Sequence, residues 1–324
     1  MIKVAIAGAT GYTGGELIRI LQNHPEADLR WLISTSLAGK SVSSVHRDLL
    51  GDCDLKFTDE TGEPDVLFMA LGHGLSREFL EKNKLPEGCK IIDLGSDFRI
   101  DNTFGNHRFV YGMSELFRED IKNTNYVANP GCFATAITLA LAPLAQESLL
   151  KDEIHIHAIT GSTGAGKSLS GSSHFSYRES NISVYKPFNH QHLGEIGKTL
   201  SVVAGDSVPQ INFIPLRGDF TRGILASVYT RVSNDYSNEM LRNLYETAYI
   251  KSPFVHLSKE TVSLKEVVNT NKVLIQAERH GEYVHITSVI DNLIKGASGQ
   301  AVQNMNIMFG FEESCGLRLK GSAF

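Results

Sequence analysis

One cysteine of the chain stands where it could act as a nucleophile. The stretch "NPGCFATAITLALAPLA" begins with the turn sequence Asn129–Gly131, and Cys132 follows at the start of an apolar run that predicts a buried helix. A thiol at a helix N-terminus has a lowered pKa and is a better nucleophile. Cys132 could instead be a small buried apolar residue, as most free cysteines are.

A thiolate needs a proton carrier nearby, and "HQHLGEI" offers candidates. His190, His192 and Glu195 lie at the start of a helix predicted near residues 191–204. Two histidines and a carboxylate could also bind a metal ion. The sequence provides no third and fourth ligand at suitable spacing, so acid–base work is favoured and no metal is expected.

The elements that would position these groups begin with a dinucleotide-binding unit. A buried strand over residues 2–7 is followed by Gly8, Gly11 and Gly14, then by a helix that ends before Pro25, and by a second strand over 29–34. Such glycines let the backbone approach a pyrophosphate, which the free N–H groups of the helix N-terminus bind. The spacing departs from the commonest G-x-G-x-x-G, and a glycine turn can also serve only to pack a helix on a strand.

Residues after the second strand indicate which dinucleotide is bound. The stretch 34–40 carries Ser34, Ser36 and Lys40 and no carboxylate. A carboxylate there would repel the 2′-phosphate of NADP, so the sequence favours NADP(H) over NAD, unless the stretch is an ordinary polar loop. Two more predicted strands end near Gly72 and Arg99, and Arg99 could anchor a phosphate or a carboxylate.

The cysteine, the histidines and the dinucleotide-binding unit together indicate one chemistry. A cysteine thiolate forms a thioester or thiohemiacetal at a carbonyl carbon, and hydride passes between that carbon and nicotinamide. The expected class is therefore an oxidoreductase acting on an aldehyde or an acyl phosphate.

Four stretches are similar to a known family. "GATGYTGGEL", "NPGCFAT", "HQHLGEI" and "DNLIKGASGQAVQNMN" resemble the N-acyl-gamma-glutamyl-phosphate reductases of arginine biosynthesis, and the similarity runs nearly end to end. The wider relatives are aspartate-semialdehyde and glyceraldehyde-phosphate dehydrogenases. The resemblance implies NADPH-dependent reduction of a small-molecule acyl phosphate to a semialdehyde through a Cys132 thioester, with one of the two histidines as acid/base.

The resemblance also implies roles for individual residues. Gln191 and Gly194 replace an arginine and a proline of the family pattern H-R-H-x-P-E, which leaves the local substrate contacts open. Substrate binding is expected at Arg99, Asn129 and Lys167. Cofactor binding is expected at Gly8, Thr10, Gly11, Tyr12, Thr13, Gly14, Ser34, Ser36, Gly72, Ser162, Gly164 and Asn292.

Bulk composition sets the domain organisation and the compartment. The 324 residues are 42% hydrophobic and 21% charged with a net charge of −5, which favours neither nucleic acid nor a membrane as partner. The four scattered cysteines fit a reduced, cytoplasmic protein. We expect an α/β protein with an N-terminal Rossmann domain (1–131 plus a C-terminal helix, 296–324). The second, α+β domain (132–295) has a mixed or antiparallel sheet, like glyceraldehyde-phosphate dehydrogenase, and forms a homodimer or homotetramer by family analogy.

One motif suggests a different class of protein. Gly161–Ser168 spell G-x-x-x-x-G-K-S, the phosphate-binding loop of nucleotide hydrolases, after a predicted strand. Such a loop needs a helix directly after its lysine, and "LSGSSHFSYRESN" disfavours one. A magnesium-binding aspartate is also missing, since the strand before Asp291 alternates like one with an exposed face. A flexible turn near the nicotinamide is expected instead.

Two further classes of protein share part of this pattern. An aspartate-semialdehyde dehydrogenase would have the same cofactor and thiol, but it should lack the "HQHLGEI" arrangement. A sensor could keep the Rossmann domain and lose catalysis, and the presence of Cys132 argues against it.

Overall fold

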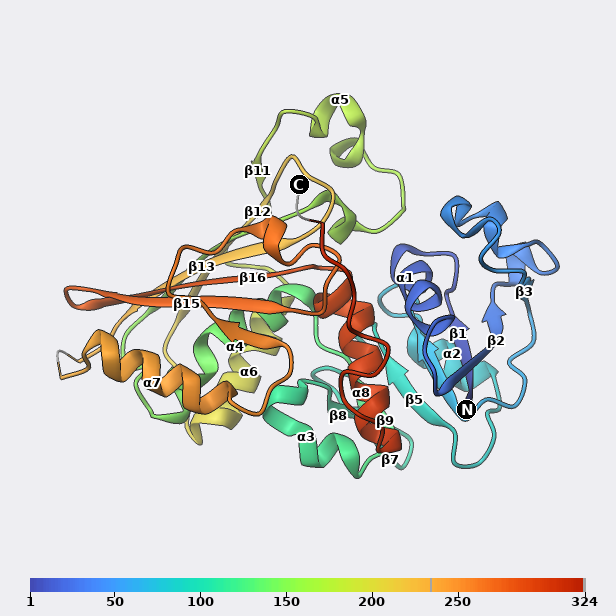
Figure 1. Ribbon diagram of the computed structural model, residues 1–324, viewed down its shortest axis with the longest axis horizontal. Helices are drawn as coiled ribbons and strands as arrows, with labels where there is room; N and C mark the ends of the chain where they lie inside the picture. Colours follow the sequence, from blue (N-terminus) through green and yellow to red (C-terminus); the bar gives the residue numbers. More distant parts are fainter. Residues whose placement is uncertain (234, 323–324) are drawn as a thin grey trace. The chain divides into compact units, whose positions relative to one another are not determined.

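The computed structural model describes residues 1–233 and 235–322, and these form two compact units. Unit 1 comprises residues 1–130 and 297–318. Unit 2 comprises residues 131–296 together with the described residues after 318. Figure 1 colours the chain along the sequence, so that the first segment of unit 1 is blue to cyan and its C-terminal helix is red.

Unit 1 is built on a parallel sheet of seven strands in the order β3-β2-β1-β4-β5-β9-β8. Every neighbouring pair is parallel, as in a doubly wound dinucleotide-binding fold. Its strands are β1 (Ile2–Ala7), β2 (Ala27–Ile33), β3 (Phe57–Thr58), β4 (Val66–Met69), β5 (Lys90–Asp93), β8 (Val110–Tyr111) and β9 (Tyr126–Ala128), and a small hairpin pairs β6 (Thr103–Phe104) with β7 (His107–Arg108). Its helices are α1 (Tyr12–Leu21), α2 (Ser76–Lys82), α3 (Ser114–Lys122) and α8 (Gly299–Phe309).

The glycine loop between β1 and α1 is required by close packing. Gly8 has φ +78°, and a β-carbon there would collide with the backbone carbonyl of Ala70 at the end of β4. A β-carbon on Gly14 would lie 2.5 Å from the carbonyl oxygen of Gly8. Only glycine therefore allows the first turn of α1 to pack on the β1–α1 loop.

We expect Gly8→Ala to lower the free energy of unfolding by about 3 kcal/mol, because it combines a left-handed backbone with a backbone collision. Gly39→Ala is the matched control. Gly39 has φ +82° and open space around it, so this change adds only about 1 kcal/mol of backbone strain. Urea unfolding of both variants measures the difference in the free energy of unfolding. An equal loss of this free energy in both variants would show that the backbone relieves the collision at no cost.

Helix α8 is buried along almost its whole length in unit 1, although four of its buried residues are polar. Asn304 shows how such groups are satisfied, because its amide donates to the backbone carbonyl of Gly112 at 2.8 Å and to Oδ1 of Asn129 at 3.1 Å. The Asn129 amide in turn donates to the carbonyl of Ala297 at 3.1 Å. These contacts tie the end of β9 to the start of α8.

Unit 2 is built on a mixed sheet of seven strands in the order β11-β12-β10-β13-β16-β15-β14. Helices α4, α6 and α7 lie along one face of this sheet in Figure 1, and α5 lies in the long green connection between β10 and β11. The strands are β10 (Ile154–Thr160), β11 (Ser183–Val184), β12 (Ile211–Arg217), β13 (Ile224–Arg231), β14 (Val255–Leu257), β15 (Val273–His280) and β16 (Tyr283–Ile290). The helices are α4 (Cys132–Gln146), α5 (Phe175–Arg178), α6 (His192–Ala204) and α7 (Asn238–Tyr249). The expected mixed sheet is thereby confirmed.

The apolar helix α4 is the core of unit 2 and contains a proline. Pro143 has no N–H, so the carbonyl of Leu139 one turn earlier lacks its helical donor. The Tyr249 hydroxyl donates to this carbonyl, and the Tyr245 hydroxyl donates to Ala140 at 2.6 Å. Helix α7 thus supplies the hydrogen bonds that let α4 continue through its proline.

Strand β16 differs from the expectation of an exposed face. Residues 286–291 are all buried, without the predicted alternation. The strand lies inside the sheet between β13 and β15. Val289 packs in a cluster with Val262 and Val267, which belong to the connection between β14 and β15. That connection covers the face which the sequence pattern left polar.

Candidate active site

Cys132 is the first residue of α4, and the backbone just before it is held by a buried carboxylate. Oε1 of Glu195 accepts a hydrogen bond from the N–H of Gly131 at 2.8 Å, and Glu195 is 3% exposed. The start of α6 is thereby tied to the start of α4 in unit 2. The positive end of the α4 dipole favours the thiolate form of a cysteine at this position.

His190 lies in an aromatic cage beside the start of α4. Its ring makes edge contacts with Phe133, Tyr185 and Phe213 at centroid distances of 5.4 to 5.7 Å, and with His192 at 4.7 Å. Nδ1 of His190 accepts a hydrogen bond from the backbone N–H of His192 at 3.1 Å. Because Nδ1 is an acceptor, a neutral ring carries its proton on Nε2.

Burial keeps the His190 ring neutral. Desolvation lowers the pKa of His190 to about 4, and the positive charges of Lys186 and Arg217 act in the same direction. At neutral pH, His190 is therefore a neutral donor through Nε2. It can hydrogen-bond to negative charge on a substrate oxygen, but it is poorly suited to accept a proton.

The titration of His190 can be followed directly by NMR of the ring Cε1–H, assigned with a His190→Gln variant. We expect no protonation near the ordinary pKa of 6.5 and a midpoint near 4. As the pH falls, His190 takes up a proton in the unfolded chain near pH 6.5, before it does so in the folded protein. The free energy of unfolding is therefore unaffected by this group above pH 6.5 and decreases as the pH falls toward 4. A midpoint near 6.5 would contradict the buried, neutral assignment.

Two residues that the sequence analysis missed lie beside His190. Short strand β11 pairs Ser183 with Arg217 at the end of β12, and the Arg217 guanidinium lies over the Tyr185 ring at 4.8 Å. Burial, and the neighbouring Cys132, raise the pKa of Tyr185. A signal for Arg217 was available, since it ends a predicted strand, where ligands of such sheets gather.

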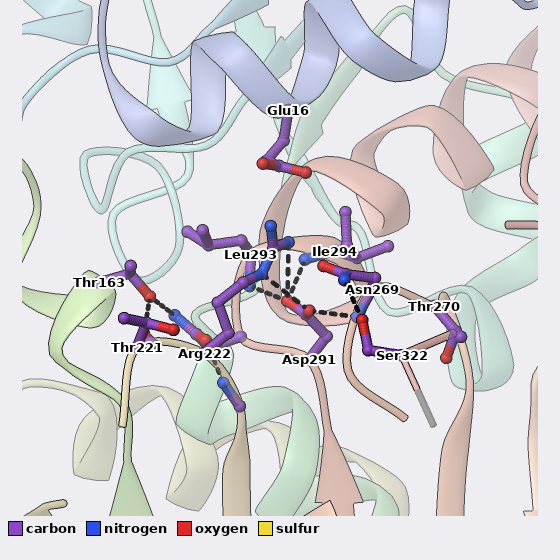
Figure 2. A network of polar contacts seen from close by, with 12 residues as sticks. Glu16, Thr163, Thr221, Arg222, Asn269, Thr270, Asp291, Leu293, Ile294 and Ser322 are labelled. Carbon is purple, nitrogen blue, oxygen red and sulfur yellow. Dashed lines mark hydrogen bonds and ion pairs between the residues drawn. The ribbon is translucent and has the colours of Figure 1, made fainter. Parts of the chain in front are cut away.

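A buried aspartate positions the segment that packs against Cys132. Figure 2 shows Asp291 accepting from the backbone N–H groups of Leu293 and Ile294 through Oδ1, and from Asn269 N–H and Arg222 Nε through Oδ2. The segment then reaches Gly296, where a β-carbon would lie 2.8 Å from the β-carbon of Cys132. The Asp291 network therefore supports the wall of the cysteine site.

The loop that resembles a hydrolase motif does not form a phosphate-binding loop. Ser162–Ala165 form a 3₁₀ turn, and no helix follows directly after Lys167 and Ser168. The first turn of this loop is held at Thr163, which donates to the carbonyl of Thr221 and accepts from the Asn292 amide at 3.0 Å. Gly164 and Lys167 are exposed in this loop.

Asn292 is anchored at both ends of its amide. Besides donating to Thr163, it accepts from the backbone N–H of Gly223 at 2.6 Å. This pair of contacts links three segments of unit 2. The residue expected to contact the nicotinamide thus also fixes the loop that carries Ser162.

The predicted cofactor residues of unit 1 are arranged around the start of α1. Gly11 caps the helix without any side-chain hydrogen bond, and a β-carbon there would meet only the Gly8 carbonyl oxygen at 3.6 Å. The open space and the uncapped N–H groups fit a pyrophosphate. The remaining predicted cofactor residues of this unit lie in the same loop or after a neighbouring parallel strand: Thr10, Tyr12, Thr13 and Gly14 in the loop and first turn, Ser34 and Ser36 after β2, and Gly72 after β4.

Arg99 and Asn129 are brought together at the ends of β5 and β9. Nε of Arg99 donates to the carbonyl of Asn129 at 2.9 Å, and Nη2 donates to the carbonyl of Leu94 at 2.9 Å. Burial raises the pKa of nearby Asp93 to about 6, against hydrogen bonds from Ser76 and Gly95 and the charge of Arg99. Lys167 belongs to unit 2, so the three predicted substrate residues are divided between the units.

Metal-binding clusters and membrane-spanning helices are absent from the described part of the chain. Within 1–233 and 235–322, no group of three histidine, cysteine, aspartate or glutamate side chains is placed to hold a metal ion. Over the same residues, no helix has both the length and the apolar character needed to cross a membrane.

Comparison with known proteins decides the family. The N-acetyl-gamma-glutamyl-phosphate reductases of Christiangramia forsetii and Flavobacterium johnsoniae are each 53% identical to this chain, over the full length of both proteins. The chain belongs to the N-acetyl-gamma-glutamyl-phosphate reductase family. The family models for the semialdehyde dehydrogenase NAD binding domain and dimerisation domain match residues 3–124 and 132–292. The protein is thus an oxidoreductase that uses a nicotinamide dinucleotide, which confirms the predicted enzyme class and resemblance.

Solved structures confirm the expected fold. Aspartate semialdehyde dehydrogenase II of Vibrio cholerae, complexed with ASA, matches with a TM-score of 0.71 at 17% identity, covering 96% of this chain and 98% of that one. The Candida albicans aspartate semialdehyde dehydrogenase with NADP matches with a TM-score of 0.69 at 15% identity, covering 95% and 99%. At these identities the likeness establishes the shared fold, whereas the reductase relatives establish the family.

Proposed function

We propose that this reductase converts an N-acyl-gamma-glutamyl phosphate to the N-acyl-glutamate semialdehyde in arginine biosynthesis. The observation that carries the proposal is Cys132 at the N-terminus of α4, with its preceding N–H bound by Glu195 and a neutral His190 in the adjoining cage. The Cys132 sulfur attacks the acyl carbon, a C–S bond forms, and the C–O bond to phosphate breaks with its electron pair leaving on phosphate. A bound reduced nicotinamide supplies the hydride that reduces the thioester.

The two histidines take different parts in this proposal. The Nε2–H of His190 hydrogen-bonds to negative charge that develops on the substrate oxygen, since Nδ1 is occupied by the His192 N–H. His192 carries the proton when the thiolate is expelled and the aldehyde is released. Glu195 acts through the backbone at Cys132 and is a positioning residue.

NADPH is the proposed form of the cofactor, held by unit 1. The stretch after β2 exposes Thr35, Ser36 and Lys40 without any carboxylate, which suits a 2′-phosphate. The backbone N–H groups of Tyr12, Thr13 and Gly14 would hold the pyrophosphate, and the open space at Gly11 would leave room for it. Ser162, Gly164 and Asn292 of unit 2 serve the nicotinamide end.

Arg99, Asn129 and Lys167 are proposed to bind substrate. The guanidinium of Arg99 is fixed by two backbone carbonyls, which pre-orients it for a phosphate. The exposed ammonium of Lys167 offers a more flexible contact to an anionic group.

We further propose that the protein is a cytoplasmic homodimer or homotetramer. The match of residues 132–292 to a dimerisation domain supports a role for unit 2 in assembly. On the sheet face opposite α4, His155 stacks on Tyr229 at 4.9 Å while His157 is exposed. Such a half-covered face can bury against a second copy.

The reverse reaction tests the proposed function. N-acetyl- or N-succinyl-glutamate semialdehyde is supplied with phosphate and NADP, and nicotinamide reduction is followed by its absorbance. We expect reduction that depends on phosphate, and no steady ATP hydrolysis. Failure with both semialdehydes, together with ATP hydrolysis that Lys167→Ala removes, would instead support a nucleotide hydrolase.

A further inference from the structure

Two positive charges of unit 2 stand beside the cysteine site without a carboxylate partner. Within the described residues, neither Arg217 nor Lys186 forms an ion pair with an aspartate or glutamate. Nε of Arg217 is buried and has no hydrogen-bond partner, and the guanidinium lies over the Tyr185 ring at 4.8 Å. A buried cationic donor of this kind is expected to meet an anion.

Lys186 is presented by a strained turn. Its φ is +45° and that of Phe188 is +56°, both in the left-handed region that non-glycine residues rarely adopt. Two backbone hydrogen bonds hold the turn. The Asn189 N–H donates to the Lys186 carbonyl at 3.2 Å, and the Phe188 N–H donates to the Phe213 carbonyl at 2.9 Å. Strain retained at such a turn, just before the His190 cage begins, indicates a functional constraint.

Distances connect Arg217 to the neighbour of Cys132 through one row of rings, and Lys186 directly follows Tyr185 in the chain. Arg217 lies 4.8 Å over Tyr185, the Tyr185 ring lies 5.7 Å from His190, and His190 lies 5.4 Å from Phe133, the neighbour of Cys132. Both cations also lower the pKa of His190, and Cys132 acts on Tyr185, as expected if all share one pocket.

We infer that Arg217 and Lys186 bind a carboxylate at the far end of the substrate's N-acyl group, so that the preferred acyl group is a dicarboxylic one such as succinyl. This inference rests on the proposed reductase function. An N-acetyl-glutamyl phosphate brings one carboxylate and a phosphate, and the proposed function assigns the phosphate to Arg99. The second carboxylate of an N-succinyl substrate supplies the anion for Arg217 and Lys186, and Arg217 can bind it through paired N–H groups.

The test compares kcat/KM for N-succinyl- and N-acetyl-glutamate semialdehyde in the phosphate-dependent reverse reaction. We expect wild type to prefer the N-succinyl compound by about 10- to 100-fold. Arg217→Met should remove this preference, whereas Arg217→Lys should retain part of it. The rate with the N-acetyl compound and the KM for phosphate should stay within about 3-fold of wild type.

Matched controls separate the possible outcomes. Arg231→Met removes an exposed arginine at the end of β13, which β10 separates from β12 in the sheet, and should change neither substrate's rate. A wild-type preference for N-acetyl would overturn the inference, as would equal losses with both semialdehydes or a raised KM for phosphate in Arg217→Met. If that variant does not fold, the wild-type preference and Lys186→Met decide. Absence of reaction with both compounds would instead refute the reductase function itself.

Discussion

Replacing the Cys132 sulfur by oxygen should reduce kcat by about 10⁴-fold or more in Cys132→Ser. A serine hydroxyl at this position is a far weaker nucleophile, and His190 is not arranged to activate it, because its Nδ1 is bound by a backbone N–H rather than by a carboxylate. The rate is measured as phosphate-dependent NADP reduction. Thermal unfolding should stay close to wild type, since the side chain is only partly buried.

Cys315→Ser provides the matched control for the cysteine prediction. Burial and the charges of Glu26 and Glu312 raise the pKa of Cys315, so that it stays a neutral thiol. We expect this variant to keep full activity. Retention of more than about a tenth of the activity in Cys132→Ser would contradict a covalent role for Cys132.

Removing the Glu195 carboxylate should have the second largest effect. In Glu195→Ala the N–H of Gly131 loses its acceptor, and the first turn of α4 is free to shift relative to substrate. We expect kcat to fall about 10²-fold with little change in KM, because a small misplacement of a nucleophile is costly. Glu195→Gln should recover part of the rate, since its amide oxygen can accept the same bond.

Alkylation separates positioning from simple destabilisation. The rate at which iodoacetamide modifies Cys132 should fall in Glu195→Ala and recover in Glu195→Gln. Glu147→Gln, at the exposed opposite end of α4, should leave both kcat and the alkylation rate unchanged. An unchanged kcat in Glu195→Ala, with normal folding, would show that the contact is only structural.

The sequence predicted well the parts of the fold that local patterns determine. The strand and glycine loop before α1, the helix beginning at Cys132 and the helix beginning at His192 all lie where turn residues and apolar runs placed them. Each is set by a few consecutive residues. Local pattern also argued correctly against a helix directly after Lys167, although the short helix α5 begins further along the same stretch, at Phe175.

What the sequence did not reveal depends on contacts between distant segments. Tyr185 and Lys186 lie in a stretch without periodicity, and backbone contacts of this stretch with β12 bring Tyr185 to Arg217. Strand β16 appeared half exposed because the segment that covers it, near Val262, has no regular pattern. Short strands such as β3 and β14 are fixed by their neighbours rather than by their own residues.

The central claim is a covalent acyl group on Cys132, and mass spectrometry of the intact enzyme tests it most directly. Enzyme is mixed with NADP and N-acyl-glutamate semialdehyde without phosphate, so that the thioester forms and has no phosphate to accept the acyl group. The account predicts one equivalent of NADPH per active site, a matching mass increase on the peptide that contains Cys132, and loss of this adduct when phosphate is added. Turnover without any adduct, or an adduct on a different residue, would contradict it.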